Sequence, residues 1–347
     1  MISLVDKMTL HHQQNLPFVV YSKPNSDTIL GLFQRNDTLF EVTDFTEKGF
    51  VFASFDGSQN YIIPENESEQ WSEEWTPTSE TISSKEENTF DSSAQINFQN
   101  LVTKGVQAIQ NNQFQKVVVS RKEAVDLTDF NLATAFEKLV QQYRSAFVYC
   151  FYHPRIGTWL GATPEQLLKA NATNFETMAL AGTQKVEGDE TVIWQQKEQE
   201  EQQFVTDYIV SKLNTVTTAV QVSAAYSVKA GSLWHIKTDI SGAFGAKLNL
   251  KKAIQLLHPT PAVCGLPKEI AKAFIDTYEG YDRSFYTGFL GELNRDFASD
   301  LFVNLRCMQI ENNQAHLYMG CGITKDSNPE KEWKESVNKS MTMKRIL

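Results

Sequence analysis

The sequence predicts an α+β fold whose strands pair mainly antiparallel, and three features of the pattern support this. Helical and strand-like segments alternate irregularly along the 347 residues. Most strand-like segments come as neighbouring pairs joined by short turns, which is how antiparallel hairpins look in a sequence. No unit of about 20–50 residues repeats. A doubly wound parallel sheet would show regular alternation of strands and helices instead.

The composition is that of a soluble globular protein with a sizeable core, since 41% of the residues are hydrophobic and 21% are charged. We divide the chain into three parts: a β-rich N-terminal part of the same fold (1–63), an acidic Ser/Thr-rich linker (64–95) and a catalytic region (96–347). In the first part, four short apolar and aromatic runs are separated by turn residues. We expect each to be a strand, at 17–24, 28–34, 38–45 and 49–55.

The catalytic region begins with a helical pattern over 97–114, followed by a valine-rich strand over 116–120. Residues 146–154 and 156–164 predict a hairpin, and 192–214 predict a long helix. A helix over 267–280 has a proline near its start and Gly280 just past its end. We expect the remaining elements to be strands at 285–293, 301–310 and 315–324, and a last helix from Pro329.

The acidity of the chain is local. Nine carboxylates and one lysine lie between Glu65 and Asp91, so this stretch carries −8 of the net charge of −10. The rest of the chain, at about −2, is therefore able to bind an anion. There is no basic stripe of the kind that binds nucleic acid.

The sequence also gives expectations about location. No apolar run approaches the ~18–20 residues that a membrane helix needs, and the first residues lack a secretion signal. The cysteines are far apart and have no metal-ligand spacing: Cys150, Cys264, Cys307 and Cys321. We expect free, buried thiols in a reducing cytoplasm, and no membrane contact.

Two helices carry paired acidic residues. In the last helix, Asn328 suits the N-cap and Pro329 the first turn, which puts Glu332, Glu335 and Lys339 on one face. The long earlier helix has a second pair, Glu198 and Glu201. Two such pairs are able to hold a hard cation such as Mg²⁺ together, although a single pair of this spacing is more often a solvated helix face. The stripe runs on from Glu201 to Val205 and Tyr208, so one end of it is expected to face inward.

Several other positions have both a structural and a chemical interpretation. Lys116, in QKVVVSR, has the pattern of a surface charge at a strand end. Glu165, in GATPEQLL, is either a carboxylate in the first turn of a helix or a general acid. Arg306 interrupts an apolar strand and points either outward or at a carboxylate in a cleft.

Three glycine- or proline-containing segments are candidate pocket walls. LYMGCGIT predicts a bend at Gly320 and Gly322 whose N–H groups approach an anion. ALAGTQK predicts a small-residue turn that lies against a flat ligand, with Ala181, Gly182 and Thr183. The stiff loop LHPTPAVCGLP brings in His258.

Taken together and in this order, nine motifs resemble those of the chorismate-utilising enzymes, over roughly residues 100–347. They are KVVVSR, GATPEQLL, LAGT, KEQEEQ, HPTPAVCGLP, FYTGFLGE, LFVNLRC, GCGIT and PEKEWKESVNK. The resemblance implies one large domain of stacked, mainly antiparallel sheets covered by helices, around a cleft.

The resemblance also implies roles for individual residues. Glu201 and Glu335 would bind Mg²⁺, with Glu198 and Glu332 as outer or alternative ligands. The enolpyruvyl carboxylate of chorismate would be held by Arg306, Tyr286 and the backbone at Gly320 and Gly322, with the charge of Lys339 nearby. Further substrate contacts would come from Ala181, Gly182, Thr183 and His258. One departure is Gln202, where the family commonly has histidine; an altered environment of the site is expected there rather than its loss.

Two positions point to water rather than ammonia as the nucleophile. A lysine at the position of Lys116 is typical of isochorismate and salicylate synthases, whereas aminodeoxychorismate synthases have a nucleophilic lysine where this chain has Ala181. The resemblance therefore implies an isochorismate synthase, in which Lys116 removes a proton from water attacking C2 of chorismate and Glu165 protonates the leaving C4 hydroxyl. Neither a glutamine amidotransferase subunit nor an oligomer is expected.

Three alternatives remain open. A salicylate synthase would also eliminate pyruvate, an anthranilate synthase component would use ammonia, and a catalytically silent protein would only bind chorismate. Menaquinone and catechol siderophore biosynthesis are both compatible uses of the product.

Overall fold

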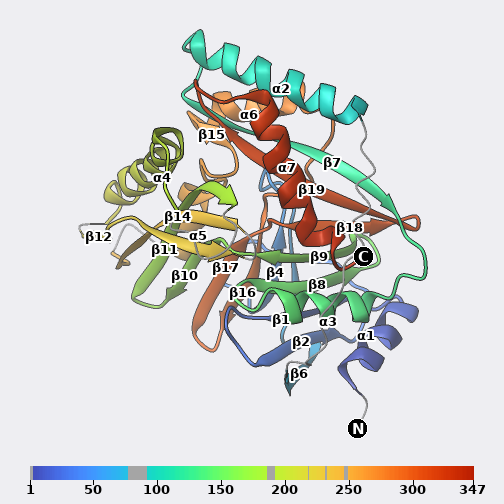
Figure 1. Ribbon diagram of the computed structural model, residues 1–347. Helices are drawn as coiled ribbons and strands as arrows, with labels where there is room; N and C mark the ends of the chain where they lie inside the picture. The colour runs from blue at the N-terminus through green and yellow to red at the C-terminus, as the bar shows by residue number, and fades with distance from the viewer. Residues whose placement is uncertain (1–2, 77–91, 186–191, 218, 231–232, 246–248) are drawn as a thin grey trace.

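Two large antiparallel sheets stacked face to face form the body of the computed structural model (Figure 1). The structure describes residues 3–76, 92–185, 192–217, 219–230, 233–245 and 249–347. Every strand pair in this part of the chain is antiparallel. The predicted α+β class is confirmed.

The first sheet has the strand order β15-β7-β19-β18-β9-β8-β1-β2-β6. Its strands are β1 Phe18–Ser22, β2 Thr28–Gln34, β6 Ser68–Glu74, β7 Lys116–Asp126, β8 Phe147–His153, β9 Gly157–Thr163, β15 Gly265–Leu266, β18 Cys307–Glu311 and β19 Gln314–Ile323.

The second sheet has the order β12-β14-β11-β10-β17-β16-β4-β5-β3, with β13 also pairing with β14. Its strands are β3 Phe40–Glu41, β4 Gly49–Ala53, β5 Asn60–Pro64, β10 Gln166–Asn171, β11 Asn174–Lys185, β12 Val220–Val222, β13 Tyr226–Ala230, β14 Leu233–Ala243, β16 Phe289–Arg295 and β17 Ala298–Val303. The N-terminal strands β1–β6 thus belong to both sheets.

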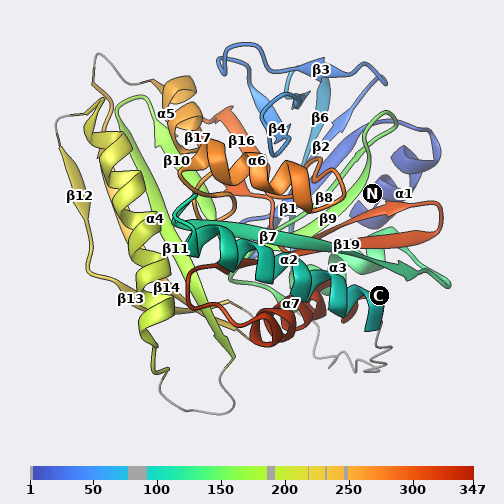
Figure 2. The ribbon, with the colours of Figure 1, turned by 90° about the horizontal axis from the view of Figure 1, so that it is seen from above.

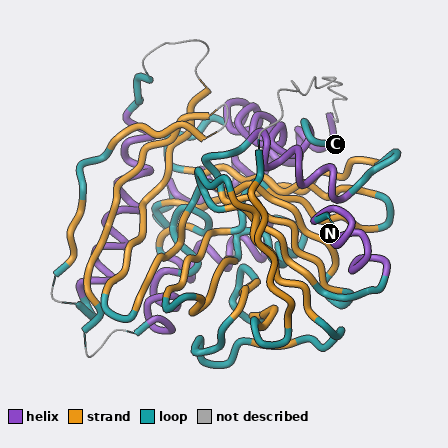
Figure 3. The backbone as a smooth tube through the Cα atoms, turned by 90° about the horizontal axis from the view of Figure 1, so that it is seen from below, coloured by secondary structure: helices purple, strands orange, loops and turns teal. Residues whose placement is uncertain are grey.

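Helices cover the outer faces, while strands make up most of the interior (Figures 2 and 3). They are α1 Leu4–Gln13, α2 Ser92–Gln110, α3 Leu132–Gln142, α4 Gln196–Asn214, α5 Leu250–Leu257, α6 Lys268–Tyr278 and α7 Pro329–Lys344. The predicted start of α7 is confirmed, because the Asn328 side chain accepts hydrogen bonds from the N–H groups of Glu330 and Lys331. Within the described residues, no helix is long and apolar enough to cross a membrane.

Strand β8 is apolar or aromatic along nearly all of its length because both of its faces are buried. Alternate side chains of a strand face opposite sides of the sheet, and both sides of β8 are covered. Phe147, Tyr149 and Phe151 face the second sheet, where Phe151 stacks on Phe52 of β4 with ring centroids 4.3 Å apart. The intervening residues pack in the cluster that includes α1 and α3. Separate apolar clusters lie under α4 and α5 and under α2, α6 and α7.

The segment 301–310, predicted as one strand, is two strands in different sheets. β17 ends at Val303 in the second sheet, and β18 begins at Cys307 in the first. Asn304, in the break, accepts a hydrogen bond from the Tyr149 hydroxyl and donates one to the carbonyl of Phe285. Arg306 has a left-handed backbone conformation, with φ 47°. The arginine therefore lies at a crossing between the sheets and does not interrupt a strand.

A second crossing lies beside the first. β9 ends in the first sheet at Thr163, and β10 begins in the second at Gln166, so only Pro164 and Glu165 connect them. The helix start predicted at Glu165 is wrong, because the chain goes directly from strand to strand. The N–H of Val303 donates to the carbonyl of Glu165 over 2.9 Å, which joins the two crossings.

Three other expectations differ from the structure. Residues 68–74, inside the predicted linker, form the edge strand β6, whose Trp71 packs on an apolar cluster; residues 77–91 lie outside the described part of the chain. Gly320 and Gly322 lie in the straight strand β19 opposite Ser120 and Val118, not in a bend. Ala181 to Thr183 belong to the long strand β11, with a bulge at Gly182, not to a turn.

Candidate active site

A cavity of about 70 Å³ lies where the two sheets meet helices α4 and α7. Its walls come from segments far apart in the sequence, and they include most of the residues singled out above. Those are Glu165, Ala181, Gly182, Thr183, Glu201, Tyr286, Arg306, Gly320, Gly322, Glu335 and Lys339. We call it the inner cavity.

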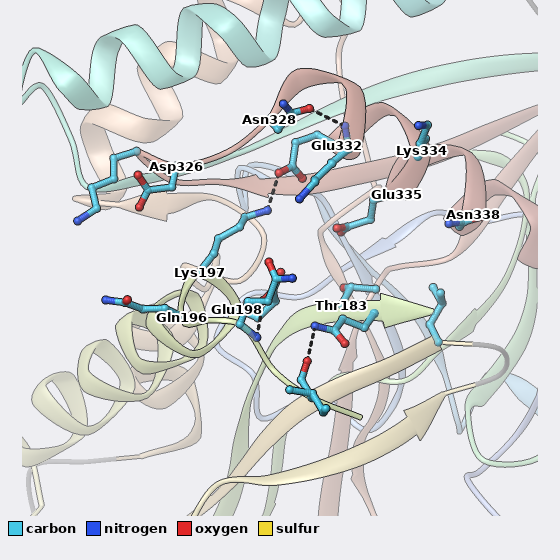
Figure 4. A pocket seen from close by; sticks show the side chains of 16 residues that line it. Thr183, Gln196, Lys197, Glu198, Asp326, Asn328, Glu332, Lys334, Glu335 and Asn338 are labelled. Atoms are coloured by element: carbon cyan, nitrogen blue, oxygen red, sulfur yellow. Dashed lines mark hydrogen bonds and ion pairs between the residues drawn. The ribbon is translucent and has the colours of Figure 1, made fainter. Parts of the chain in front are cut away.

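A larger hollow of about 790 Å³, the outer cavity, lies between the N-terminal ends of α4 and α7. It shares Thr183 and Glu335 with the inner cavity. Figure 4 shows Lys197 extending from α4 across this hollow to Glu332 on α7, with Glu335 one turn further along. The two cavities are thus neighbours, and acidic residues of α7 lie where they meet.

Three lysine–glutamate pairs, buried or partly buried, surround this junction. Lys116 Nζ lies 3.2 Å from Glu201 Oε1, Lys197 Nζ lies 2.5 Å from Glu332 Oε1, and Lys339 Nζ lies 2.7 Å from Glu335 Oε1. Three of the four carboxylates predicted to bind a metal therefore each have an ammonium beside them. The same acidic groups suit a divalent cation, because a hard cation prefers several carboxylate oxygens.

The two α7 carboxylates lie close together. Among the described residues, Glu332, Glu335 and Cys321 have their oxygen and sulfur atoms within 4.8 Å of one another. Burial raises the pKa of Glu332 to about 7; the charge of Glu335 acts in the same direction, and Lys197 opposes both. This crowding of negative charge is what a bound cation would relieve.

Glu201 is kept ionised by its surroundings. Burial favours its neutral form, but the charges of Lys116, Lys197 and Lys339 outweigh burial and lower the pKa of this carboxyl below its ordinary value. The predicted inward-facing stripe is confirmed, since Val205 and Tyr208 are buried along the same face of α4. Glu198 has a different position: its carboxylate accepts from the N–H of Gln195 in a capping box and lines only the outer cavity.

Glu165 is a buried carboxyl in the wall of the inner cavity. It is 4% exposed, and burial raises its pKa to about 8, although the charges of Lys116 and Lys339 pull the pKa down. The side chain is therefore protonated at neutral pH. A carboxylic acid in that state is able to donate a proton to a leaving group.

Lys116 is fully buried at the first position of β7, opposite Leu266 of β15. The surface position that its pattern favoured is therefore wrong. Apart from the ion pair with Glu201, its amino group makes no hydrogen bond of acceptable geometry within the described residues. Lys116 is not among the residues that line either cavity, but it pairs with Glu201, which lines the inner one.

Arg306 is directed by a histidine that the sequence analysis did not single out. His235, on β14, lies in the wall of the inner cavity. Its Nδ1 is 2.9 Å from the carbonyl of Gly182, and its Nε2 is 3.4 Å from an Arg306 nitrogen. Nδ1 therefore carries the proton and donates to Gly182, while Nε2 accepts from Arg306. Burial, with the charges of Arg306 and Lys339, lowers the pKa of His235 to about 3, so it stays neutral.

The two glycines of β19 make room for their neighbours. A Cβ at position 322 would lie 1.9 Å from Glu201 Oε1, and one at 320 would lie 2.9 Å from the Tyr286 hydroxyl. The Gly320 carbonyl accepts a hydrogen bond of 2.8 Å from Lys339 Nζ. Because neither glycine has a side chain, Glu201 and Tyr286 have room beside the strand.

His258 is not among the residues that line either cavity. Its Nε2 lies 3.2 Å from the Ser54 carbonyl, and its ring packs edge-on against Phe289. The same loop instead contributes Ala262 and Val263 to the inner cavity. Lys116 also lines neither cavity but pairs with Glu201 of the inner one, whereas His258 contacts Ser54 and Phe289, which line neither; we therefore leave His258 out of the proposed site.

Comparison with known proteins agrees with this geometry. The model of a family described as "Chorismate binding enzyme" matches residues 52–347. The chain belongs to the chorismate-binding enzymes.

Individual members of this family are similar to the chain over much of its length. Isochorismate synthase EntC from Escherichia coli is 29% identical over 267 residues, which cover 73% of the chain and 67% of the relative. A salicylate biosynthesis isochorismate synthase from Pseudomonas aeruginosa is 30% identical over 71% of the chain and 53% of the relative. The chain thus spans between half and two thirds of these relatives.

A solved structure shares the fold of this chorismate-binding enzyme. The menaquinone-specific isochorismate synthase MenF from Escherichia coli superposes with a TM-score of 0.79 at 22% identity, over 95% of this chain and 88% of that one. The stacked sheets implied by the resemblance are therefore confirmed.

Gln202, which stands where the family commonly has histidine, has hydrogen-bond partners for its side chain. The buried Gln202 side chain donates to the hydroxyls of Thr206 and Thr238, at 2.9 and 2.8 Å. Thr238 belongs to β14, so this glutamine ties α4 to the strand that carries His235.

The four cysteines are free and buried, as expected.

Proposed function

We propose that this chain is an isochorismate synthase that converts chorismate reversibly to isochorismate, adding water at C2 and releasing the C4 hydroxyl, with Mg²⁺ as cofactor. The observation that carries the proposal is a buried lysine and a buried, protonated carboxylic acid at one acidic site. Lys116 is 0% exposed, and the pKa of Glu165 is about 8. The similarity to the isochorismate synthases from Escherichia coli supports the same reaction.

Substrate binding in this proposal depends on positive groups in the inner cavity. Chorismate is a dicarboxylate, and Arg306, oriented by His235, would hold the enolpyruvyl carboxylate. Tyr286, in the same wall, adds a hydroxyl group, and Lys339 adds positive charge. Ala181 and Gly182 leave space for the ring, because neither has a bulky side chain.

The acid–base pair follows from the local environments. In its neutral amine form, Lys116 would remove a proton from the water that attacks C2, and Glu165 would give its proton to the C4 hydroxyl as that group leaves. The base keeps the water proton and the acid loses its own, so the two residues exchange roles in the reverse reaction. A carboxyl whose pKa lies near 8 is protonated at neutral pH and still acidic enough to transfer its proton.

The residues present fit Mg²⁺. Glu335 and Glu332 lie side by side, Glu201 faces the same junction, and the lysines beside them show that the site already holds positive charge. Glu201, Glu332 and Glu335 would hold the ion, with Glu198 as an outer group. When bound, Mg²⁺ would supply a counter-charge for the ring carboxylate of the substrate.

Product analysis tests the proposal. The purified chain is incubated with chorismate and MgCl₂, and the products are separated by chromatography. We expect isochorismate, and the same equilibrium mixture when isochorismate is the starting material. Adding an ammonium salt should yield no aminated product. Salicylate and pyruvate as the main products, or no turnover at all, would overturn the proposal.

A further inference from the structure

Lys197 lies at the junction of the two cavities, and the sequence predicted no role for it. It belongs to the first turn of α4 and reaches Glu332 on α7, so its side chain links the two acidic helices (Figure 4). The Glu332 side chain that it contacts is 1% exposed, whereas the Lys197 side chain is 21% exposed.

The charges around Lys197 are those of the predicted metal ligands. Glu332, Glu201 and Glu335, in decreasing order, are the carboxylates that stabilise its ammonium form. The Lys197 ammonium thus lies against Glu332, and a carboxylate oxygen of Glu332 lies within 4.8 Å of one of Glu335. A cation at this position has two of the predicted metal ligands close by.

The three lysines of the site differ in how firmly they are held. Lys116 is completely enclosed, and Lys339 bonds to the Gly320 carbonyl as well as to Glu335. Within the described residues, the hydrogen bonds of the Lys197 amine go to Glu332 alone. The outer cavity, which Lys197 lines, gives its flexible side chain space to withdraw.

We propose that Lys197 is a resident counter-ion of the acidic cluster, which occupies the place of the divalent cation until Mg²⁺ binds and displaces it into the outer cavity. The proposal rests on the proposed function, because it takes Glu201, Glu332 and Glu335 as the Mg²⁺ ligands. Lys197 keeps Glu332 paired in the metal-free chain and weakens Mg²⁺ binding by competing for it. The affinity for Mg²⁺ is therefore set partly by a residue that is not a ligand.

Isothermal titration calorimetry with MgCl₂ alone tests this without any turnover. Lys197→Met removes the competing charge and keeps the length of the side chain, so we expect Mg²⁺ to bind at least about tenfold more tightly than to the unmodified chain. Lys197→Gln retains a hydrogen-bond donor for Glu332 without the charge, and should also bind more tightly. Lys197→Arg keeps the charge and should bind no more tightly than the unmodified chain.

The matched control is Lys334→Met. Lys334 also lines the outer cavity, but it is 67% exposed and pairs with Glu330. Its replacement should change Mg²⁺ affinity less than about twofold, because an exposed charge in water acts weakly. A similar gain in this control would show that only the overall charge matters, and would overturn the proposal.

A thermal measurement gives a second readout. In EDTA, Lys197→Met should unfold at a lower temperature than the unmodified chain, because Glu332 is left buried without its partner. Saturating Mg²⁺ should remove most of this difference. Mg²⁺ binding by the unmodified chain without any gain in Lys197→Met or Lys197→Gln would overturn this inference alone; failure of the unmodified chain to bind Mg²⁺ would overturn the metal site itself.

Discussion

The amino group of Lys116 lies 3.2 Å from Oε1 of Glu201, so the residue proposed as the base and a residue proposed as a metal ligand are an ion pair. Lys116 begins a strand of the first sheet, and Glu201 lies on the helix that covers the second. The proposed base and the proposed metal ligand are thus adjacent, so replacing either residue should alter the environment of the other.

Replacement of Lys116 by methionine should stop the addition of water while chorismate still binds. Methionine fills most of the buried space but accepts no proton, so we expect turnover to fall by ~10²–10⁴. The rate is measured by product chromatography, and binding by calorimetry. Lys122→Met, an exposed position on the same strand, is the control. Near-normal turnover in Lys116→Met would remove Lys116 from the mechanism.

The pH dependence should report Glu165. This group has to be protonated to act as an acid, and its pKa is raised to about 8. Activity should therefore be retained below pH 8 and decline above it. Glu165→Gln should lose turnover by ~10²–10⁴ and abolish this decline in what remains. A high-pH decline that persists unchanged in the variant would assign it to another group.

The same carboxyl should lower the stability of the fold as the pH rises. Its pKa is about 8 in the folded chain, against an ordinary value of 4.5. Between these values the unfolded chain has released the proton that the folded chain retains, so the free energy of unfolding falls with rising pH and levels off above pH 8. Glu165→Gln should thus raise the melting temperature more at pH 8.5 than at pH 5. Glu176→Gln, on the surface of β11, should show no such difference.

Adding a methyl group at Gly322 should disturb Glu201. The new Cβ would lie 1.9 Å from Oε1 of Glu201, so the carboxylate has to move away from Lys116. We expect Gly322→Ala to lose about 100-fold in turnover and to bind Mg²⁺ more weakly, with an unchanged circular dichroism spectrum. Gly245→Ala is the control, because nothing lies within 4 Å of the added atom there. Equal activity of both variants would contradict the crowding of Glu201.

His235 should affect substrate binding more than the chemical step. His235→Phe keeps the ring but no longer accepts a hydrogen bond from Arg306, so the KM for chorismate should rise roughly tenfold, as expected for the loss of ~1.5 kcal/mol. The fall in kcat should be smaller. His316→Phe, near the β18–β19 turn, is the control. A large loss of kcat with an unchanged KM would argue for direct participation of His235 instead.

The sequence predicted those helix ends that are set by residues within one turn of the helix. The start of α7 is an example, because Asn328 and Pro329 act within one turn of the helix. The crossing at Arg306 was missed because residues on both sides of it are apolar, as in a single strand. Whether they pair in one sheet or two depends on Tyr149 and Phe285, which are distant in sequence.

The residues of the site also differ in whether the sequence around them could identify them. Lys116 and Glu165 were identified only through the order of motifs, since the pattern around Lys116 favoured a surface position. His235 stands between Trp234 and Ile236 and belongs to none of the motifs that the sequence offered. Lys197 lies beside an acidic motif, where a lysine is ordinary, and only the fold shows that it pairs with Glu332 on the other acidic helix.

The two crossings between the sheets have a consequence for how this enzyme can vary. Glu165 and Arg306 lie on connections of two and three residues, and a hydrogen bond from Val303 to Glu165 joins those connections. An insertion in either one would shift a whole strand out of register, rather than enlarge a loop. The proposed proton donor and the proposed carboxylate anchor are therefore poor targets for loop grafting. A change of substrate is better sought in the walls formed by Ala181 and Ala262, which line the inner cavity without lying on either crossing.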